Sequence, residues 1–158
     1  MDEAALWASL SDHPRIHRFL RACLSPKYII SAFHRYGDVS KYLKTHPYAD
    51  RVALVRDIAA GMDFLHKRGG LHGDLKATNV LVDDGGKACI SDFGLSEVRQ
   101  ESETISQALK KGKTDGPVTG TMRWMSPERL RGGSLDPKVD VYAFGMTCYE
   151  VRERNYSQ

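Results

Sequence analysis

Apolar residues recur along this chain with two spacings, one typical of helices and one typical of short strands. After Asp50, the apolar positions Val55, Ile58 and Met62 follow one another at helical spacing, which places them on one face of a helix. The basic and glycine residues at 67–70 then indicate where this helix ends.

Two further segments carry clear patterns. Pro137 begins a predicted helix that continues to Glu150, and because its apolar residues fall on most sides, we expect it to be buried on most sides. Two short apolar runs, 80–82 and 88–90, flank an Asp/Gly-rich turn and predict a β-hairpin. The remaining predicted elements are helices at 4–10 and 39–43, strands at 16–24 and 28–32, and a mobile loop at 97–118 that is rich in Ser, Thr, Lys and Gly.

The composition is that of a soluble globular domain. The 158 residues match about one domain, and a hydrophobic content of 41% with 27% charged residues is ordinary. A net charge of +3, spread along the chain, is too small to indicate a nucleic-acid surface. Residues 1–10 are acidic rather than basic, so they do not resemble a signal peptide, and the longest apolar stretch, at 28–33, is too short to span a membrane.

The three cysteines, Cys23, Cys89 and Cys148, lie far apart in the sequence. Their spacing matches neither a disulfide framework nor a metal-binding motif, so a reducing compartment is the simplest interpretation. We therefore expect a cytoplasmic protein without a membrane or nucleic-acid partner.

Three short strings with polar residues follow one another between residues 72 and 128. HGDLKATN occupies 72–79, DFG occupies 92–94 after a predicted strand, and SPE occupies 126–128. Alone, each string also fits a structural role, such as a packed phenylalanine, a solvated lysine or a turn-capping amide. Together, their order and spacing match the kinase signatures H-R-D-L-x-x-x-N, D-F-G and A-P-E, with glycine replacing the arginine and serine replacing the alanine. From Glu3 to about Val151, the chain therefore resembles a protein kinase catalytic domain.

The resemblance implies phosphoryl transfer, a reaction that depends mainly on positioning and charge neutralisation. Asp74 would accept the proton of the attacking hydroxyl, and Lys76 would hold the transferred phosphate. Asn79 and Asp92 would supply oxygen ligands for Mg²⁺, which bridges the phosphates of ATP. The implied cofactors are ATP and Mg²⁺, and the implied partner is a protein substrate.

The same resemblance implies an adenine site where a strand runs into the hinge between the two lobes. Ser31 corresponds to the gatekeeper residue, and backbone groups of Ala32 and His34 would bind adenine. Leu81 would form the apolar floor of this pocket, although a core strand position explains its hydrophobicity equally well.

Seven residues resemble positions of structural or regulatory importance in the family. Glu3 would form an ion pair from the small-lobe helix. Thr121 would dock the substrate, and Asp140 would accept hydrogen bonds from the backbone of the catalytic loop. The other four lie within the three strings, at His72, Phe93, Gly94 and Glu128.

The resemblance also bears on the acceptor residue. Lys76 is typical of Ser/Thr kinases, and Thr121 matches their substrate-docking threonine, whereas the Arg-Trp-Met run at 123–125 is typical of tyrosine kinases. This mixture resembles the tyrosine-kinase-like group, whose members mostly modify Ser and Thr. Gly73 replaces the arginine that grips an activation-loop phosphate in many kinases, so we expect activation-loop phosphorylation to matter little.

The implied fold is α+β and two-lobed, and we expect it to be truncated at both ends. Residues 1–33 would be a remnant of the small lobe, and residues 34–158 part of the large lobe. No G-x-G-x-x-G string and no strand lysine precede Glu3 within this sequence, and the closing helices of the kinase fold are also expected to be missing. A second interpretation therefore stays open, in which the chain is a catalytically silent remnant that binds or regulates.

Overall fold

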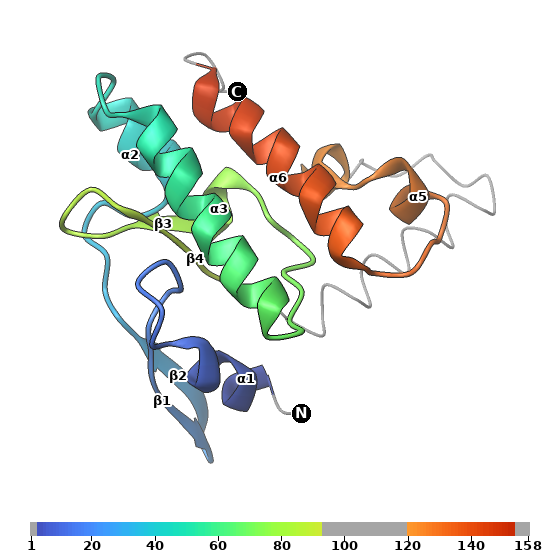
Figure 1. The fold of residues 1–158 in the computed structure, drawn as a ribbon. Helices are drawn as coiled ribbons and strands as arrows, with labels where there is room; N and C mark the ends of the chain where they lie inside the picture. The colour runs from blue at the N-terminus through green and yellow to red at the C-terminus, as the bar shows by residue number, and fades with distance from the viewer. Residues whose placement is uncertain (1–2, 93–119, 154–158) are drawn as a thin grey trace.

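The computed structural model describes residues 3–92 and 120–153 (Figure 1). The predicted mobile loop at 97–118 lies outside these residues. In chain order the elements are α1 (Glu3–Leu10), β1 (Phe19–Leu24), β2 (Lys27–Ser31), α2 (Val39–Thr45), α3 (Arg51–Lys67), the 3₁₀ turn η1 (Ala77–Asn79), β3 (Val80–Val82), β4 (Ala88–Ile90), the 3₁₀ turn η2 (Gly120–Trp124), α5 (Pro127–Leu130) and α6 (Pro137–Arg152).

Helix α3 is the centre of the fold and confirms the helix predicted after Asp50. The Asp50 side chain caps it by accepting a hydrogen bond from the backbone N–H of Ala53 at 3.0 Å. Figure 1 shows α3 between the β3–β4 hairpin and α6, and it contacts both β4 and α6. The buried face of α3 carries Leu54, Ile58, Met62 and Leu65, which form much of the hydrophobic core.

A close approach attaches α3 to the segment before β1. A Cβ atom at Gly61 would lie 2.7 Å from the carbonyl oxygen of Arg15, so only glycine fits there without displacement. The Arg15 guanidinium lies 3.1 Å from one oxygen of Asp57, and the other oxygen of Asp57 accepts a hydrogen bond from the backbone N–H of Ala88. One buried carboxylate of α3 thus binds both the Arg15 segment and β4.

The two hairpins are antiparallel, and the segment before β1 joins them. The sequence predicted a strand over 16–24, but β1 begins at Phe19 because Ile16 forms a parallel bridge to Ile90 in β4. The backbone N–H of His17 donates to the carbonyl of Ile90 at 2.8 Å. In the second hairpin, Leu81 of β3 lies opposite Cys89 of β4.

Helix α6 is buried along one side only, so the prediction of burial on most sides is wrong for the described chain. Its buried residues recur at helical spacing and form one face, which packs against α3 and the segments that carry the polar strings. Asp140 belongs to this face. Val141, Tyr142 and Tyr149 point elsewhere and are 62%, 39% and 49% exposed. The buried residues of α6 are Val139, Asp140, Ala143, Thr147 and Val151.

The short helix α5 was not predicted, because four residues leave too little periodicity to detect. Its local signal is Ser126, whose hydroxyl caps the helix by accepting a hydrogen bond from the N–H of Arg129 at 3.3 Å. Helices and short antiparallel sheets occur together, which confirms the α+β class. Within residues 3–92 and 120–153, no helix is long and apolar enough to cross a membrane.

Candidate active site

The polar loop at 72–79 is held at its start by helix α6. Asp140 is fully buried, and its two oxygens accept hydrogen bonds from the backbone N–H groups of His72 and Gly73, both at 2.8 Å. The ring nitrogen Nε2 of His66 also lies 2.8 Å from Asp140. Gly73 has a φ of 80°, a left-handed conformation that an arginine would adopt only with strain. The glycine that departs from the kinase pattern therefore matches the local backbone.

The buried ring of His72 lies among three carboxylates. Burial lowers the pKa of His72, and the negative charges of Asp140, Asp74 and Asp92 oppose that shift. Nδ1 of the same ring accepts a hydrogen bond from the backbone N–H of Asp74 at 3.3 Å. The neutral ring of His72 thus lies near Asp74 and Asp92, the acidic residues of two of the polar strings.

Asp74, Lys76 and Asn79 form one compact polar cluster. Asp74 Oδ2 lies 2.7 Å from the Lys76 ammonium and 3.0 Å from the amide nitrogen of Asn79. The Asn79 amide nitrogen also donates to the Asp74 carbonyl at 2.8 Å. The second oxygen, Asp74 Oδ1, is buried and has no hydrogen-bond partner among the described residues. The carboxylate is therefore fixed by one oxygen while the other keeps its lone pairs for an incoming group.

Asn79 and Asp92 offer oxygens that suit a hard cation. Because the Asn79 amide nitrogen is directed at Asp74, its side-chain oxygen remains as a potential ligand. Ser91 links the two residues, since its hydroxyl donates to the Asn79 carbonyl at 3.0 Å and lies 3.5 Å from Asp92 Oδ2. Asp92 is exposed and has a φ of 55°, which is uncommon outside glycine and is typical of functional positions.

A second acid of α6, missed in the sequence, supports the far end of the loop. Glu150 Oε2 accepts hydrogen bonds from the backbone N–H of Ala77 at 2.9 Å and from the Trp124 indole at 2.7 Å. Burial raises the pKa of Glu150, and these hydrogen bonds oppose that shift. The signal available in the sequence was its helical spacing from Asp140, which places both acids on related faces of α6.

A small pocket lies beside Asp74, and the buried Val139, Asp140 and Ala143 of α6 form one of its sides. Gly73 and Leu75 line it from the loop, and Trp124, Met125 and Arg129 line it from the segment that carries η2 and α5.

Among the residues that the kinase resemblance singled out, Glu128 is exposed in the first turn of α5. Phe93, Gly94 and the side chains of Glu3 and Thr121 lie outside the described part of the structure.

The residues expected to bind adenine lie between the two hairpins. Ser31 is the last residue of β2. The backbone N–H of Ala32 already donates to the carbonyl of Arg18 at 3.0 Å, so at Ala32 only the backbone carbonyl is left to bind adenine. The structure brings His34 and Leu81 together through Cys89, whose sulfur lies 3.7 Å from His34 Nε2 and 3.6 Å from the Leu81 carbonyl.

Comparison with known proteins agrees with this geometry. The family model described as protein tyrosine and serine/threonine kinase matches residues 1–157. The chain is 35% identical over 156 residues to the serine/threonine/tyrosine-protein kinase HT1 of Arabidopsis thaliana, an alignment that covers 94% of this chain and 37% of that protein. It is 36% identical over 150 residues to the dual specificity protein kinase shkA of Dictyostelium discoideum, covering 90% of this chain and 27% of that protein.

A third relative, the serine/threonine-protein kinase STY46 of Arabidopsis thaliana, is 31% identical over 147 residues, which is 88% of this chain and 24% of that protein. The chain thus spans well under half the length of these relatives. The family match nevertheless extends over nearly all of the chain, including the loop at 72–79 and the helix that holds it. This chain belongs to the protein tyrosine and serine/threonine kinase family.

Proposed function

We propose that the protein transfers the γ-phosphate of ATP to serine and threonine hydroxyls of protein substrates, with Asp74 accepting the hydroxyl proton. The observation that carries this proposal is the state of the Asp74 carboxylate. Lys76 and Asn79 hold one oxygen, and the other oxygen is buried without a hydrogen-bond partner in the described chain. A fixed carboxylate with an unused oxygen is suited to act as a general base.

The remaining residues have distinct roles in this proposal. Lys76 presents its ammonium 2.7 Å from Asp74 and would neutralise charge on the transferred phosphoryl group. Asn79 and Asp92 would hold Mg²⁺ through their side-chain oxygens. When bound, Mg²⁺ neutralises the negative charge of the ATP phosphates. Asp140 and Glu150 act as positioning residues, because they bind the loop backbone on either side of Asp74.

Adenine would lie against Leu81 and bind the backbone of residues 32–34, with Ser31 at the inner end of the pocket. This part of the proposal rests on the position of Leu81 next to the segment that follows β2. Leu81 is half-buried, so it offers apolar surface to a ligand rather than being enclosed in the core. Glu3, His72, Phe93, Gly94, Thr121 and Glu128 keep the structural or regulatory roles that the kinase pattern implies.

The preference for serine and threonine is supported by Lys76 and Thr121, the two positions at which the chain resembles Ser/Thr kinases. The names of two relatives, however, describe a serine/threonine/tyrosine kinase and a dual specificity kinase. The names of these relatives all describe kinases, and none favours a catalytically silent module.

The test measures phosphate transfer from labelled ATP by the full-length protein to an acceptor that contains Ser, Thr and Tyr. We expect label on Ser and Thr, and Asp74→Asn should reduce transfer by about 10²–10⁴-fold because the general base is lost. Asp63→Asn is the matched control, since Asp63 is an exposed acid on α3 that pairs with Lys67. Label mainly on Tyr would contradict the specificity, and unchanged transfer in Asp74→Asn would contradict the mechanism.

A further inference from the structure

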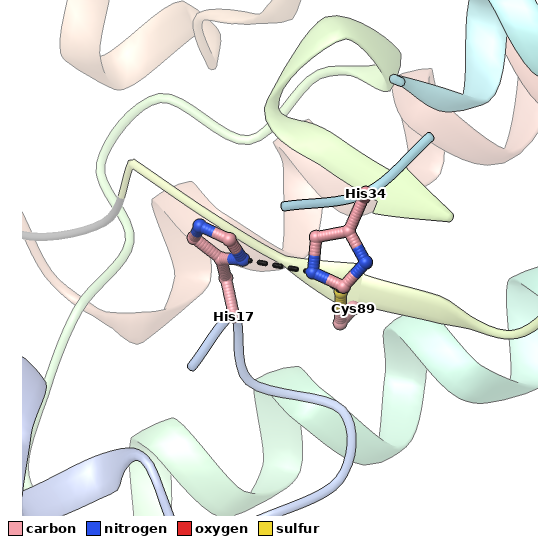
Figure 2. A group of neighbouring side chains, drawn as sticks. All are labelled: His17, His34 and Cys89. Atoms are coloured by element: carbon pink, nitrogen blue, oxygen red, sulfur yellow. Dashed lines mark hydrogen bonds between the residues drawn. The ribbon is translucent and has the colours of Figure 1, made fainter. Parts of the chain in front are cut away.

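Two histidines and one cysteine from separate segments meet between the two hairpins (Figure 2). His17 precedes β1, His34 follows β2, and Cys89 is the middle residue of β4. His17 Nδ1 lies 3.0 Å from His34 Nε2, and the sulfur of Cys89 lies 3.7 Å from the same nitrogen. The three potential ligand atoms all lie within 4.8 Å of one another.

Two of the three separations are close to the edges of a tetrahedral zinc site. With Zn–N bonds of about 2.0–2.1 Å and a Zn–S bond of about 2.3 Å, tetrahedral geometry puts two nitrogens about 3.3 Å apart and a nitrogen about 3.6 Å from sulfur. The observed 3.0 Å and 3.7 Å are each within a few tenths of an ångström of these values. The ligand atoms of His17 and Cys89 lie within 4.8 Å of each other, and side-chain rotation that brings this third edge to about 3.6 Å would direct all three atoms at one ion.

We propose that His17, His34 and Cys89 form a binding site for zinc. Two imidazole nitrogens and one thiolate are ligands that zinc accepts readily, and three protein ligands leave a fourth position for water. The site does not depend on the proposed kinase reaction. It is also separate from Asn79 and Asp92, whose oxygens suit Mg²⁺ and not a metal that prefers nitrogen and sulfur.

The chemical state of the side chains is compatible with metal binding. Burial, together with the neighbouring His34, lowers the pKa of His17 to about 4, so the ring is neutral near pH 7 and keeps a lone pair. Burial raises the pKa of the Cys89 thiol to about 12, so without metal the thiol keeps its proton. On binding, the S–H bond breaks, the sulfur binds zinc, and one proton is released to water.

The main competing interpretation is that the cluster is only a hydrogen-bonded part of the core. In that case a hydrogen bond joins His17 and His34, and the thiol of Cys89 donates to the Leu81 carbonyl at 3.6 Å. These contacts satisfy the same atoms without an ion. The two interpretations differ in one measurable respect, because only the first gives a zinc affinity that depends on all three side chains.

A metal at this position would add a side-chain link between parts of the fold that backbone hydrogen bonds already join. His17 and His34 flank the two ends of the β1–β2 hairpin, whereas Cys89 belongs to the β3–β4 hairpin. A zinc ion would therefore reinforce the attachment of both ends of the first hairpin to the second. The segment it fixes includes residues 32–34, next to Leu81, so zinc should also restrict motion at the proposed adenine site.

The experiment titrates Zn²⁺, and Co²⁺ as its spectroscopic substitute, into metal-free full-length protein under reducing conditions. We compare the wild type with Cys89→Ser and His34→Gln, and with the controls Cys23→Ser and Cys148→Ser, which change the two other cysteines of this sequence. Far-ultraviolet circular dichroism checks that each variant is folded. His34 is only half-buried, so His34→Gln provides a second test if the buried Cys89→Ser variant unfolds.

We expect wild type and both controls to bind one more zinc equivalent than the two cluster variants. Their cobalt forms should show a thiolate-to-cobalt charge-transfer band that Cys89→Ser lacks. Loss of either ligand should weaken zinc binding by more than the roughly 10–100-fold that loss of an outer-shell partner costs. Equal zinc uptake by wild type, folded Cys89→Ser and His34→Gln would overturn the proposal, as would competition by Mg²⁺ at similar concentrations.

Discussion

Replacing Asp140 with asparagine tests how the catalytic loop is held, and the structure predicts a loss of both stability and turnover. Asparagine has the shape of aspartate but exchanges one acceptor oxygen for an N–H₂ donor. Asp140 is fully buried, and each of its oxygens already accepts at least one hydrogen bond, from Gly73 at Oδ1 and from His72 at Oδ2. Whichever oxygen the amide nitrogen replaces, a buried N–H group then faces another donor.

The magnitude follows from these contacts. Leaving one buried donor unsatisfied costs about 1–3 kcal/mol, and the remaining hydrogen bonds lose the strength that a charged acceptor gives them. Together we expect the free energy of unfolding to fall by about 2–4 kcal/mol. At roughly 2–4 °C per kcal/mol for a domain of this size, the melting temperature should fall by about 4–16 °C.

The effect on catalysis should be a loss of turnover more than of nucleotide affinity. The loop that Asp140 anchors contains Asp74, and a displacement of about 1 Å at a reacting group can reduce the rate by about 100-fold. We therefore expect kcat to fall about 10–100-fold with a smaller change in KM for ATP. Differential scanning calorimetry measures the stability, and initial rates over a range of ATP concentrations separate kcat from KM.

The matched control is Asp63→Asn on α3. Asp63 is exposed and forms a surface ion pair with Lys67 at 2.7 Å, which contributes at most about 1 kcal/mol. If Asp140→Asn and Asp63→Asn change the melting temperature and kcat equally, the buried hydrogen bonds of Asp140 do not position the loop. A fall in stability without any fall in kcat would refute the link between loop anchoring and catalysis.

Two further predictions concern packing and pH. Gly61→Ala should lower the free energy of unfolding by about 1–3 kcal/mol in urea denaturation, because its Cβ would overlap the Arg15 carbonyl, whereas Gly145→Ala on the open side of α6 should raise it by about 0.5–1 kcal/mol; shifts of the same sign would contradict this packing argument. Burial raises the pKa of Glu150, so the folded state holds its proton more tightly than the unfolded chain, and stability should fall as pH rises through the raised pKa. Denaturation from about pH 4 to about pH 7 should show a shallower decline for Glu150→Gln than for wild type, and a steeper one would refute the assignment.

The sequence predicted those elements whose hydrophobic period is long or whose turn residues are distinctive. Helix α3 has several turns of one-sided apolar spacing, and the β3–β4 hairpin is marked by the Asp/Gly turn at 83–86, so both are where they were expected. The position of Asp74 beside Lys76 and Asn79 also follows from the order of residues in one short loop. Local patterns are sufficient for such features because the interacting residues are neighbours in the chain.

Features that depend on distant contacts could not be predicted in the same way. The cysteine spacing gave no indication of a metal site, because the partners of Cys89 are histidines brought close by long-range contacts such as the pairings of Ile16 with Ile90 and of Asp38 with Leu81. Strand β1 begins later than predicted for the same reason. The exposed apolar residues of α6 are a second case in which the sequence was not sufficient. An apolar side chain indicates a preference for burial, but the sequence does not show whether a neighbouring element covers it.

The positions of the two acids on α6 explain how a loop with little regular structure can hold the geometry proposed for catalysis. Asp140 accepts hydrogen bonds from the backbone N–H groups of residues 72 and 73, and Glu150 accepts one from the N–H of residue 77. One helix therefore holds the loop at two points on either side of Asp74 and Lys76. Ten residues of α-helix separate these acids by about 15 Å along the axis, a fixed length that does not vary with loop motion. Asp74 and Lys76 lie between these two attachment points. The helix therefore fixes the ends of the loop segment that carries both residues. Because α6 is itself held against α3, where the Arg51 side chain donates to the carbonyl of Val151, changes at that remote contact should alter the geometry of the loop and thus of the proposed active site.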